Sequence, residues 1–575
     1  MKEVQHHGVN LLSALEKYDR NERNKFDSRY LRGNIKPNLV DALTGSVPES
    51  DALLLKFHGI YQQDNRENRT SRARRKLEPD YQFMVRLRIP GGRLTAGQWL
   101  GLDQISRQYA ERGLRITTRQ TIQLHGVRKP RLADCLKAIG KIGLDTIAAC
   151  GDDSRGVVCG ANPLLPKVQQ AVEALAVETS HYLIPKTRAY AETWYDDVPQ
   201  AIGDNEDPMY GPLYLPRKFK VGFVIPPVND IDVFAQDLGF IAITERKKLA
   251  GFAVCVGGGM GQLDNRQDSY PRLAEPIGFI DANEAPEFAG IVMGIQRDYG
   301  NRVDRHRARF KYTLDHYGTE WFLTELAQRR GKPLMPVRPY GFSQNGDIFG
   351  WQQVSADHWN LTLQITSGRV SGELQDKLVL LIKNSGGKIR LTTNQNITLT
   401  DITGLARTSL LPLLDTLQLT ACAQPDTQLA YSLSCVALPT CGLAMAESER
   451  YLPDFIEKFT ALKLKHGLEH FPVTLRITGC PNGCARPYLA EIGMTGRAPG
   501  LYNLYLGGSF HGDRLNRLYA PNLNEEKILF ILDELLSLFS RERHPDEYFG
   551  DYLIRTGKID QQLMRITNNQ QPMEA

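Results

Sequence analysis

The hydrophobic and polar positions of this chain fall into blocks that predict strands followed by helices. Alternation predicts a strand over residues 83–89, which runs into the turn sequence Pro90-Gly91-Gly92. Apolar residues at helical spacing then predict a helix from Thr95. A second strand is expected over residues 114–126 and a second helix through residues 132–139. Elements in this order form an α+β unit.

The same unit recurs in the second half of the chain. Residues 361–369 parallel residues 86–93, and residues 389–399 parallel residues 114–124. An Arg-x-Thr-Thr-x-Gln core is present in both copies of the second strand. The helices expected in the later copy cover residues 372–385 and 405–418. We therefore expect an internal duplication in which two α+β half-domains pack together.

A further segment follows each half-domain, and the two segments share the order strand, turn, helix, strand and glycine pair. The first has an apolar strand up to Ile225 and glycines at 257–259, and the second extends from Leu475 to the glycines at 507–508. Apolar spacing also predicts helices over residues 452–467 and 525–542.

The two ends of the chain have less regular patterns. Residues 1–75 are polar with short apolar islands, which indicates an extended arm laid over the other domains. The basic run over residues 66–76 is typical of a solvated loop, and a loop that closes over an acidic ligand is the alternative. The tail after Asp560 is polar and is expected to be ordered only by docking.

Four of the nine cysteines lie within 50 residues, as the pairs Cys435/Cys441 and Cys480/Cys484. A strand expected over residues 473–478 delivers the second pair into a Pro-Asn-Gly turn. Two turns that each present two thiols suit an iron–sulfur cluster or a structural zinc ion. The five-residue gap in the first pair is wide for zinc and favours the cluster. Burial of the four thiols as small hydrophobic side chains is the remaining interpretation.

The composition is that of a globular protein. A length of 575 residues predicts several domains, and no apolar run approaches the roughly 20 residues that a membrane-spanning helix needs. The start of the chain lacks the apolar segment of a secretory signal, and the other five cysteines show no paired spacing, which together indicate a reducing cytoplasm. A net charge of +5 is too small to indicate a nucleic-acid partner.

Cationic residues are concentrated at predicted strand ends and turns rather than on helix faces. They include Arg86, Arg155, Arg217, Lys218 and Lys220. Alternation along residues 114–126 would also line one face of that strand with hydrogen-bond donors. This face carries Arg115, Thr117, Arg119, Thr121, Gln123 and His125. It would suit an anionic ligand, although an ordinary solvated sheet surface has the same composition.

Together these motifs resemble the sirohaem-containing sulfite and nitrite reductases, over nearly the whole chain. The resemblance is carried by the two cysteine pairs, the Arg-x-Thr-Thr-Arg-Gln-Thr strand, Pro-Arg-Lys-Phe-Lys at 216–220 and the duplication. Four further segments are similar to the haemoprotein (beta) subunits of bacterial NADPH-dependent assimilatory enzymes. These segments cover residues 30–33, 56–63, 187–192 and 439–447.

The resemblance implies an α+β, internally duplicated sulfite/nitrite reductase fold. Such a fold pairs two ferredoxin-like half-domains and adds two mixed α/β cofactor-binding domains. The implied division is an N-terminal arm (1–75), half-domain copy one (76–150), a sirohaem- and substrate-binding domain (151–345), half-domain copy two (346–420) and a cluster- and sirohaem-ligating domain (421–575).

The resemblance also implies the roles of the candidate site residues. Cys435, Cys441, Cys480 and Cys484 would hold a [4Fe-4S] cluster, and Cys484 would also be the axial ligand of the sirohaem iron. The carboxylates of sirohaem need donors, because buried charge must be compensated. The implied cofactor-binding residues are Arg115, Thr117, Arg119, Gln123, His125, Arg217, Gln395 and Asn482. The implied catalytic residues around sulfite are Arg86, Arg155, Lys218 and Lys220.

Thr118 departs from the family pattern, in which asparagine is common at this position. The alternating pattern predicts that its side chain points away from the donor-rich face and has a minor effect.

The implied activity is the six-electron reduction of sulfite to sulfide, in sulfate assimilation and cysteine biosynthesis. No dinucleotide fingerprint is evident, because Gly257-Gly-Gly-Met-Gly261 lacks the required spacing and following helix. Electrons would therefore come from a flavoprotein (alpha) subunit that carries FAD and FMN. The alternatives are a ferredoxin-dependent sulfite or nitrite reductase and, more distantly, a zinc-bound non-catalytic assembly protein.

Overall fold

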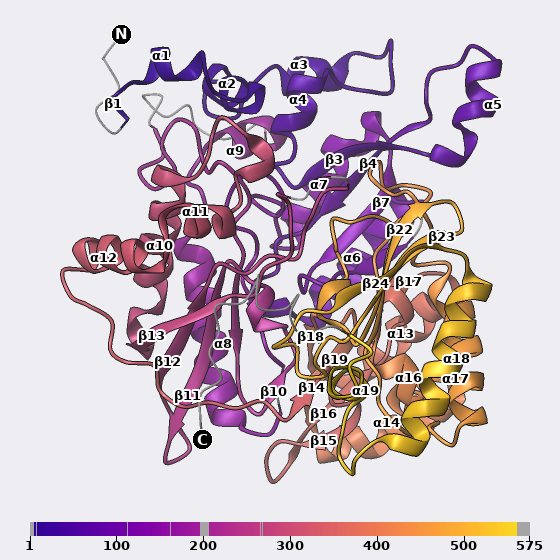
Figure 1. Cartoon of the computed structure of the whole chain (residues 1–575). Coiled ribbons are helices and arrows are strands. Elements are labelled where there is room, and N and C mark those ends of the chain that lie inside the picture. The colour runs from indigo at the N-terminus through magenta and orange to yellow at the C-terminus, as the bar shows by residue number, and fades with distance from the viewer. Residues whose placement is uncertain are drawn as a thin grey trace.

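The computed structural model describes residues 5–6, 9–111, 113–161, 163–195, 206–264, 266 and 268–559. Within these residues the strands form four five-stranded sheets and two two-stranded sheets. Figure 1 shows the N-terminal helices along the top of the molecule, above two regions that lie side by side. Two of the five-stranded sheets belong to the repeated half-domains, and the other two follow them in the chain.

The sheet of the first half-domain has the strand order β17-β6-β7-β4-β3. Helices α6 (Ala96–Tyr109) and α7 (Leu132–Lys141) belong to this unit, and Thr95 forms a capping box with Gln98 at the start of α6. The strands are β3 (Ile60–Asp64), β4 (Tyr81–Arg86), β6 (Leu114–Ile116), β7 (Ile122–Val127) and β17 (Arg369–Val370).

The sheet of the second half-domain has the order β15-β16-β19-β18-β5. Its helices are α13 (Gly372–Ser385) and α14 (Gly404–Thr416), close to the ranges that the sequence predicts. Its strands are β15 (Gly350–Gln353), β16 (His358–Leu363), β19 (Ile397–Thr403), β18 (Lys388–Leu391) and β5 (Arg93–Leu94).

Each half-domain supplies one strand to the sheet of the other. Strand β5 of the first copy pairs with β18, and β17 of the second copy pairs with β6. Gly92 and Gly368 lie at the two crossings with φ values of 72° and 71°. A Cβ on Gly92 would lie 2.6 Å from the carbonyl oxygen of Leu391, so glycine is required by both conformation and space. This exchange binds the two copies into one unit.

The prediction of one continuous strand over residues 114–126 is wrong. β6 and β7 form a tight antiparallel hairpin in which Leu114 lies opposite Leu124. The Thr117 side chain accepts a hydrogen bond from the Arg119 amide at 3.2 Å, and Gln120 has a φ of 52°. The same turn recurs between β18 and β19, where Gln395 has a φ of 69°. The shared Thr-Thr-x-Gln sequence is therefore a turn, and its residues do not alternate on one face.

The two remaining sheets share one topology. Each has three parallel strands followed by two antiparallel strands. The first comprises β8 (Val158–Cys159), β9 (Val221–Val224), β11 (Leu238–Glu245), β12 (Lys248–Val256) and β13 (Glu275–Asp281). The second comprises β20 (Ser432–Ser434), β21 (Leu475–Thr478), β22 (Ile492–Ala498), β23 (Leu501–Leu506) and β24 (Arg517–Leu523).

Helices pack against both sheets, and Figure 1 shows α12 at the left edge of the molecule and α17 and α18 at the right edge. The helical layer of the first sheet comprises α8 (Pro166–Tyr182), α10 (Ala285–Tyr299), α11 (Phe310–Tyr317) and α12 (Thr319–Arg330), whereas α9 (Ala189–Trp194) packs against α7. The helices of the second sheet are α16 (Thr427–Ala430), α17 (Leu452–Lys465), α18 (Glu525–Glu542) and α19 (Phe549–Arg555), whereas α15 (Thr420–Ala423) contacts β15 and β16 of the second half-domain. Buried residues of both regions, including Ile241, Leu489 and Tyr505, form one apolar cluster that joins the two sheets.

The N-terminal residues contain more regular structure than the sequence predicts. Apolar islands such as Leu54, Leu55 and Ile60 are buried, and that burial fixes short elements around them. The described elements are β1 (Gln5–His6), β2 (Val9–Asn10), α1 (Leu11–Leu15), α2 (Arg20–Asp27), α3 (Ile35–Val40), α4 (Glu49–Leu54) and α5 (Arg69–Arg74). β3 also comes from this segment and pairs with β4.

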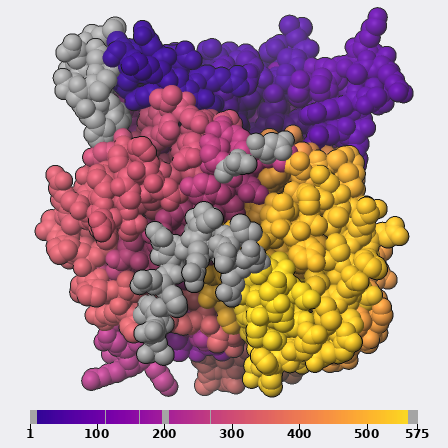
Figure 2. All heavy atoms as spheres, viewed as in Figure 1, coloured from indigo at the N-terminus to yellow at the C-terminus, as the bar shows by residue number. Residues whose placement is uncertain are grey.

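Helix α5 contains most of the basic run over residues 66–76, and none of its residues is buried. It projects from the molecule at the upper right of Figures 1 and 2. The strands β10 (Val228–Asn229) and β14 (Gln344–Asn345) form a separate parallel pair. The tail after Asp560 lies outside the described residues. Among the residues that are described, no helix has both the length and the apolar character needed to cross a membrane.

Candidate functional site

The two cysteine pairs lie in loops that follow adjacent parallel strands. Cys435 comes directly after β20, and Cys480 and Cys484 follow β21, which pairs with β20 in parallel register. Because the carboxyl ends of parallel strands meet at the same sheet edge, the two loops are brought together there. The Gly479 amide lies 3.3 Å from Cys435 Sγ and donates to it across the two loops.

The four thiols are close enough to affect one another electrostatically. Burial raises the pKa of Cys435, and negative charge on Cys484, Cys441 and Cys480 would raise it further. Burial, with the same influence from Cys484, raises the pKa of Cys480 to about 12. Bound iron would stabilise these thiols as thiolates against that cost. In the described part of the chain, no group of three or more His, Cys, Asp or Glu side chains is arranged to hold a single metal ion.

The second cysteine turn presents its two thiols differently, since Cys480 is buried and Cys484 is exposed. The Asn482 amide lies 3.7 Å from Cys480 Sγ. The Thr118 hydroxyl donates a 3.0 Å hydrogen bond to the backbone carbonyl of Cys484. The expectation that Thr118 points away from the site is therefore wrong, because the hairpin turn carries it onto the Cys484 loop.

Three of the expected catalytic cations come from two neighbouring segments of the other α/β sheet. A parallel bridge pairs Ser154 with Phe219, and the Arg155 amide donates to the Phe219 carbonyl at 2.9 Å. This pairing extends β8 and β9 and places Arg155 beside Lys218 and Lys220. The Lys220 amide in turn donates to the buried carboxylate of Asp237 at 3.0 Å.

The positive charges around these lysines lower their pKa values. Burial, with the charges of Arg217 and Lys220, holds the pKa of Lys218 well below its usual value. Burial, with the charges of Arg309 and Arg119, lowers the pKa of Lys220 to about 7. A thiolate at Cys484 would act on Lys220 in the opposite direction, so this lysine lies within electrostatic reach of Cys484.

Arg86 is the fourth expected catalytic cation, and it lies opposite Gln123 where β4 pairs with β7. In the amide orientation that satisfies both side chains, Gln123 Oε1 lies 3.1 Å from Arg86 Nε and its nitrogen lies 3.3 Å from His125 Nε2. Arg86 also donates to Cys150 Sγ at 3.4 Å. His125 is buried. Gln123 thus links Arg86 to His125 in one polar chain.

Arg119 and Arg217 border the same group of cations. Arg119 donates to the Gln236 side chain at 2.6 Å and to the Gly156 carbonyl at 2.7 Å, which places the hairpin turn against the segment that carries Arg155. Burial and the charge of Arg155 lower its pKa to about 9. Arg217 is half-buried with Asp152 at 3.6 Å, and burial with the charge of Arg305 lowers its pKa to about 10.

Three residues expected to bind sirohaem have other partners in the structure. Thr117 stabilises the hairpin turn through the Arg119 amide. Gln395 donates to the Ser367 carbonyl at 3.2 Å and accepts from the Ser434 amide at 3.4 Å, so it holds the strand that precedes Cys435. Arg115 forms a buried ion pair with Glu449 at 2.7 Å.

The duplication explains the position of Arg115. Glu449 also binds Arg369 at 2.7 Å, and Arg369 lies opposite Arg115 where β17 pairs with β6. The second copy holds the equivalent arrangement, in which one glutamate binds two arginines that lie opposite each other across β5 and β18. Its members are Glu173, Arg93 at 2.6 Å and Arg390 at 2.7 Å. Arg115 therefore belongs to a repeated interface contact.

The structure adds residues that the sequence reasoning missed. Arg309 Nη2 lies 2.9 Å from both carboxylate oxygens of Asp237, and its charge acts on both Lys218 and Lys220. Lys311 donates to the Gly261 carbonyl at 2.8 Å. Tyr61 hydrogen-bonds Arg155, and burial raises its pKa. The alternating basic residues at 305, 307, 309 and 311 are a signal that could have revealed Arg309.

These residues fit the cofactors that the sequence implies. The four thiols occupy two adjoining loops, and the exposed Cys484 lies at the edge that faces the cations. The Nε atom of Arg119 is buried and lacks a hydrogen-bond partner within the described residues. Buried donors of this kind require an acceptor, and carboxylates or a sulfur oxyanion would supply one.

Comparison with known proteins identifies the class to which this fold and site belong. The model for the nitrite/sulfite reductase ferredoxin-like half domain matches residues 74–142 and again residues 352–414, which confirms the duplication. The model for the nitrite and sulphite reductase 4Fe-4S domain matches residues 179–334. The structure of the Mycobacterium tuberculosis NirA protein has the same fold, with a TM-score of 0.78, 24% identity and coverage of 95% of this chain and 98% of that one.

Curated relatives narrow the assignment. The sulfite reductase [NADPH] hemoprotein beta-component of Nitrosomonas europaea is 50% identical over 95% of both chains. The protein of the same name from Bordetella petrii is 51% identical over 95% of this chain and 94% of its own length. This chain belongs to the family of sulfite reductase [NADPH] hemoprotein beta-components.

Proposed function

We propose that this chain reduces sulfite to sulfide at a sirohaem coupled to a [4Fe-4S] cluster, for sulfate assimilation and cysteine biosynthesis. The observation that carries the proposal is the position of Cys484. It is the exposed member of the four cysteines, and it lies within electrostatic reach of Lys220 in a group of buried and half-buried cations. A thiol shared by two redox centres next to an oxyanion pocket is the arrangement that this chemistry needs.

The residues divide into three groups by what they would hold. Cys435, Cys441, Cys480 and Cys484 would hold the cluster, with Cys484 also reaching the haem iron. Arg119, Gln123, His125, Arg217 and Asn482 remain candidates for the haem carboxylates and the loop around Cys484. Arg115, Thr117 and Gln395 would support that pocket through the protein contacts described above. When bound, the two cofactors supply the iron that takes sulfite and the electrons that reduce it.

The cations would bind sulfite and deliver protons to it. Reduction to sulfide removes three oxygens as water, so each turnover consumes protons as well as six electrons. Arg86 and Arg155 would hold the anion, since guanidinium groups bind oxyanions through several donors. Lys218 and Lys220 can give up a proton more readily than an ordinary lysine because burial and neighbouring charges lower their pKa values, to about 7 for Lys220. Reprotonation from solvent would restore them between steps.

Electrons would come from a partner protein. The relatives' name describes a beta-component of an NADPH enzyme, which supports a separate alpha-component that oxidises NADPH. We propose that this partner is a flavoprotein with FAD and FMN. A cytoplasmic location follows from that donor, since NADPH is a cytoplasmic reductant.

The test begins with the purified protein. Iron and acid-labile sulfide analysis, with a visible spectrum, should reveal a cluster and a sirohaem in comparable amounts. A reduced viologen dye should then drive sulfite consumption without any partner. Addition of NADPH with a flavoprotein subunit should replace the dye, and reduced ferredoxin should do so poorly. A colourless, iron-free protein from cells that make both cofactors would refute the proposal.

A further inference from the structure

The two α/β sheets are related by approximate two-fold symmetry, which pairs individual residues between them. The Lys220 amide donates to Asp237 at 3.0 Å, and the Thr474 amide donates to Glu491 at 2.8 Å. The Gly257 and Gly507 amides donate to the carbonyls of those same acidic residues. Asp237 and Glu491 are therefore equivalent positions, each directly before the third strand of its sheet.

The same symmetry pairs Asp232 with Arg486. Each lies five residues before its acidic counterpart, and each begins a short 3-10 turn, at 233–235 and 487–489. Each also has a left-handed backbone, with φ values of 48° and 56°. Residues other than glycine rarely adopt this conformation, so surrounding contacts must hold both residues in it.

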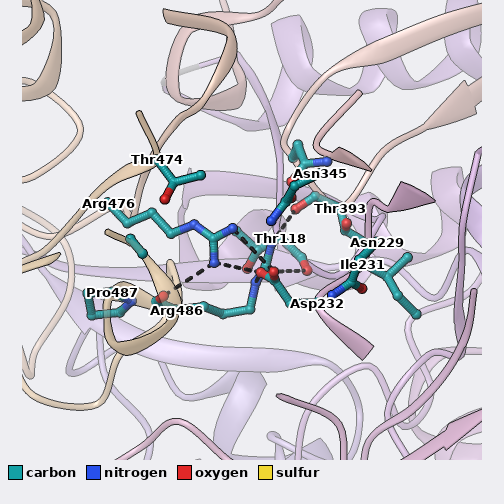
Figure 3. Close-up of polar contacts among 12 residues, drawn as sticks. Thr118, Asn229, Ile231, Asp232, Asn345, Thr393, Thr474, Arg476, Arg486 and Pro487 are labelled. Atoms are coloured by element: carbon teal, nitrogen blue, oxygen red, sulfur yellow. Dashed lines mark hydrogen bonds and ion pairs between the residues drawn. The ribbon is translucent and has the colours of Figure 1, made fainter. Parts of the chain in front are cut away.

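Asp232 and Arg486 contact each other in an ion pair between the two sheets. The other two ends of the Arg486 guanidinium bind the carbonyls of Thr118 and Thr393, each at 3.3 Å. Thr118 and Thr393 are the matching residues of the two hairpin turns. Figure 3 shows the side chains of Arg476 and Arg486 converging on Asp232, close to Thr118 and Thr393. One guanidinium thus connects both half-domains and both α/β sheets.

Asp232 is held in its charged form. Burial alone would raise its pKa, but Arg476 and Arg486 keep it below its usual value. Arg476 Nη1 lies 2.6 Å from Asp232 Oδ2 and 3.3 Å from the Arg486 carbonyl. Arg476, Arg486 and Asp232 are all buried, so their geometry is fixed by these mutual contacts rather than by solvent.

Arg486 is two residues beyond Cys484 in the chain. Its amide donates to the Gly483 carbonyl at 2.9 Å, which closes the cysteine turn. The hairpin turn that Arg486 grips also reaches back to this turn, because the Thr118 hydroxyl donates to the Cys484 carbonyl. The backbone around Cys484 is therefore held from two sides, by Arg486 within its own turn and by Thr118 of the hairpin turn that Arg486 contacts.

We propose that Asp232, Arg486 and Thr118 are positioning residues that fix the direction of the Cys484 thiol toward the haem side of the site. The inference rests on the proposed function and adds to it a role for residues that the duplicated elements bring together. It does not require these residues to touch either cofactor. These contacts hold the Cys484 end of the turn, whereas Cys435 and Cys441 lie in the other cysteine loop, so their loss would act most directly on the direction in which Cys484 points.

The test uses full-length protein purified with its cofactors. Arg486→Lys keeps the charge, but one ammonium group cannot reach Asp232, Thr118 and Thr393 together. Asp232→Asn keeps the shape and removes the charge. In both variants we expect cluster iron and labile sulfide to stay near wild type. The sirohaem content per cluster should fall several-fold, or the haem absorption band and electron paramagnetic resonance signal should shift.

Glu173→Gln is the matched control. Glu173 also binds two arginines between domains, but it lies in the repeated interface contact of the other half. This variant should lose thermal stability and keep the wild-type haem and cluster signals. If it shifts those signals as much as Arg486→Lys does, the effect is general loosening and the proposal is wrong.

Thr118 provides a second test that does not depend on buried charge. Thr118→Val removes only the hydroxyl that reaches the Cys484 carbonyl, and we expect it to shift the haem spectrum in the same direction. Thr118→Ser should restore the wild-type signal. Wild-type spectra in Thr118→Val, Arg486→Lys and Asp232→Asn would overturn the inference. Absence of both cofactors from the wild-type protein would instead refute the proposed function.

Discussion

Replacing Lys220 with arginine should remove the alkaline decline of sulfite reduction. Burial and the charges of Arg309 and Arg119 lower the pKa of Lys220 to about 7, so this lysine loses its proton as the pH rises through that value. Above it, the protonated fraction falls about tenfold for each pH unit. If proton donation from Lys220 limits turnover, kcat/KM should follow that fraction.

An arginine stays charged across the same range and cannot serve as the acid. Lys220→Arg should therefore show a lower but flatter profile, and Lys220→Met should lose about 10²- to 10⁴-fold, which is the usual contribution of a positioned acid. The assay is dye-driven sulfite consumption as a function of pH, which avoids the partner. Spectra must first show that both variants keep their cofactors. An alkaline decline that persists unchanged in Lys220→Arg would refute the reasoning.

The surface of the molecule offers a matched control for this experiment. Lys248 begins β12, is exposed and lies at the tip of the β11–β12 hairpin. Lys248→Arg should leave the pH profile of the wild type unchanged.

Three further predictions concern the surroundings of the site. Glu449→Gln leaves the buried Arg115 without its charged partner and should lower the free energy of unfolding by about 3–5 kcal/mol, measured by chemical denaturation. The absorption spectrum should show that both cofactors stay bound. Loss of sirohaem alone would instead indicate that Arg115 binds the cofactor. Arg309→Met removes one of the charges that lower the pKa of Lys220, so the alkaline decline in kcat/KM should move to higher pH, and an unmoved decline would exclude that coupling. Gly368 has a left-handed φ of 71°, and a Cβ there would clash with the Ile116 carbonyl, so Gly368→Ala should lower the melting temperature. Gly386→Ala should lower it less, because Gly386 has a φ of 61° but open space around it. Equal melting temperatures would show that the backbone at the crossing can relax.

The elements that could be predicted from the sequence are those with local signals. The helices at 372–385 and 525–542 match their expected ranges, because apolar spacing alone defines them. The duplication was visible because the Thr-Thr-x-Gln sequence is repeated. Proline, asparagine and glycine between Cys480 and Cys484 marked the second cysteine turn. Each of these signals depends only on neighbouring residues.

The parts that could not be predicted depend on distant contacts. The hairpin turns at 117–120 and 392–395 contain neither glycine nor proline, so alternation seemed to continue through them. The ion pair between Arg115 and Glu449 has no local signal, because the two residues lie 334 positions apart in the chain. The orientation of Thr118 toward the Cys484 carbonyl follows from the hairpin turn, which alternation does not predict. Tertiary pairing decides all three positions.

The exchange of β5 and β17 has a consequence for the order in which the protein can be made. The first half-domain lacks its edge strand until the ribosome has synthesised residue 370, and the second takes an edge strand from near residue 93. Neither sheet can be completed during the early part of translation, and the cysteine loops come later still. Insertion of the prosthetic groups must therefore wait for a nearly complete polypeptide, so a nascent chain that stalls before that point would offer them no finished binding site.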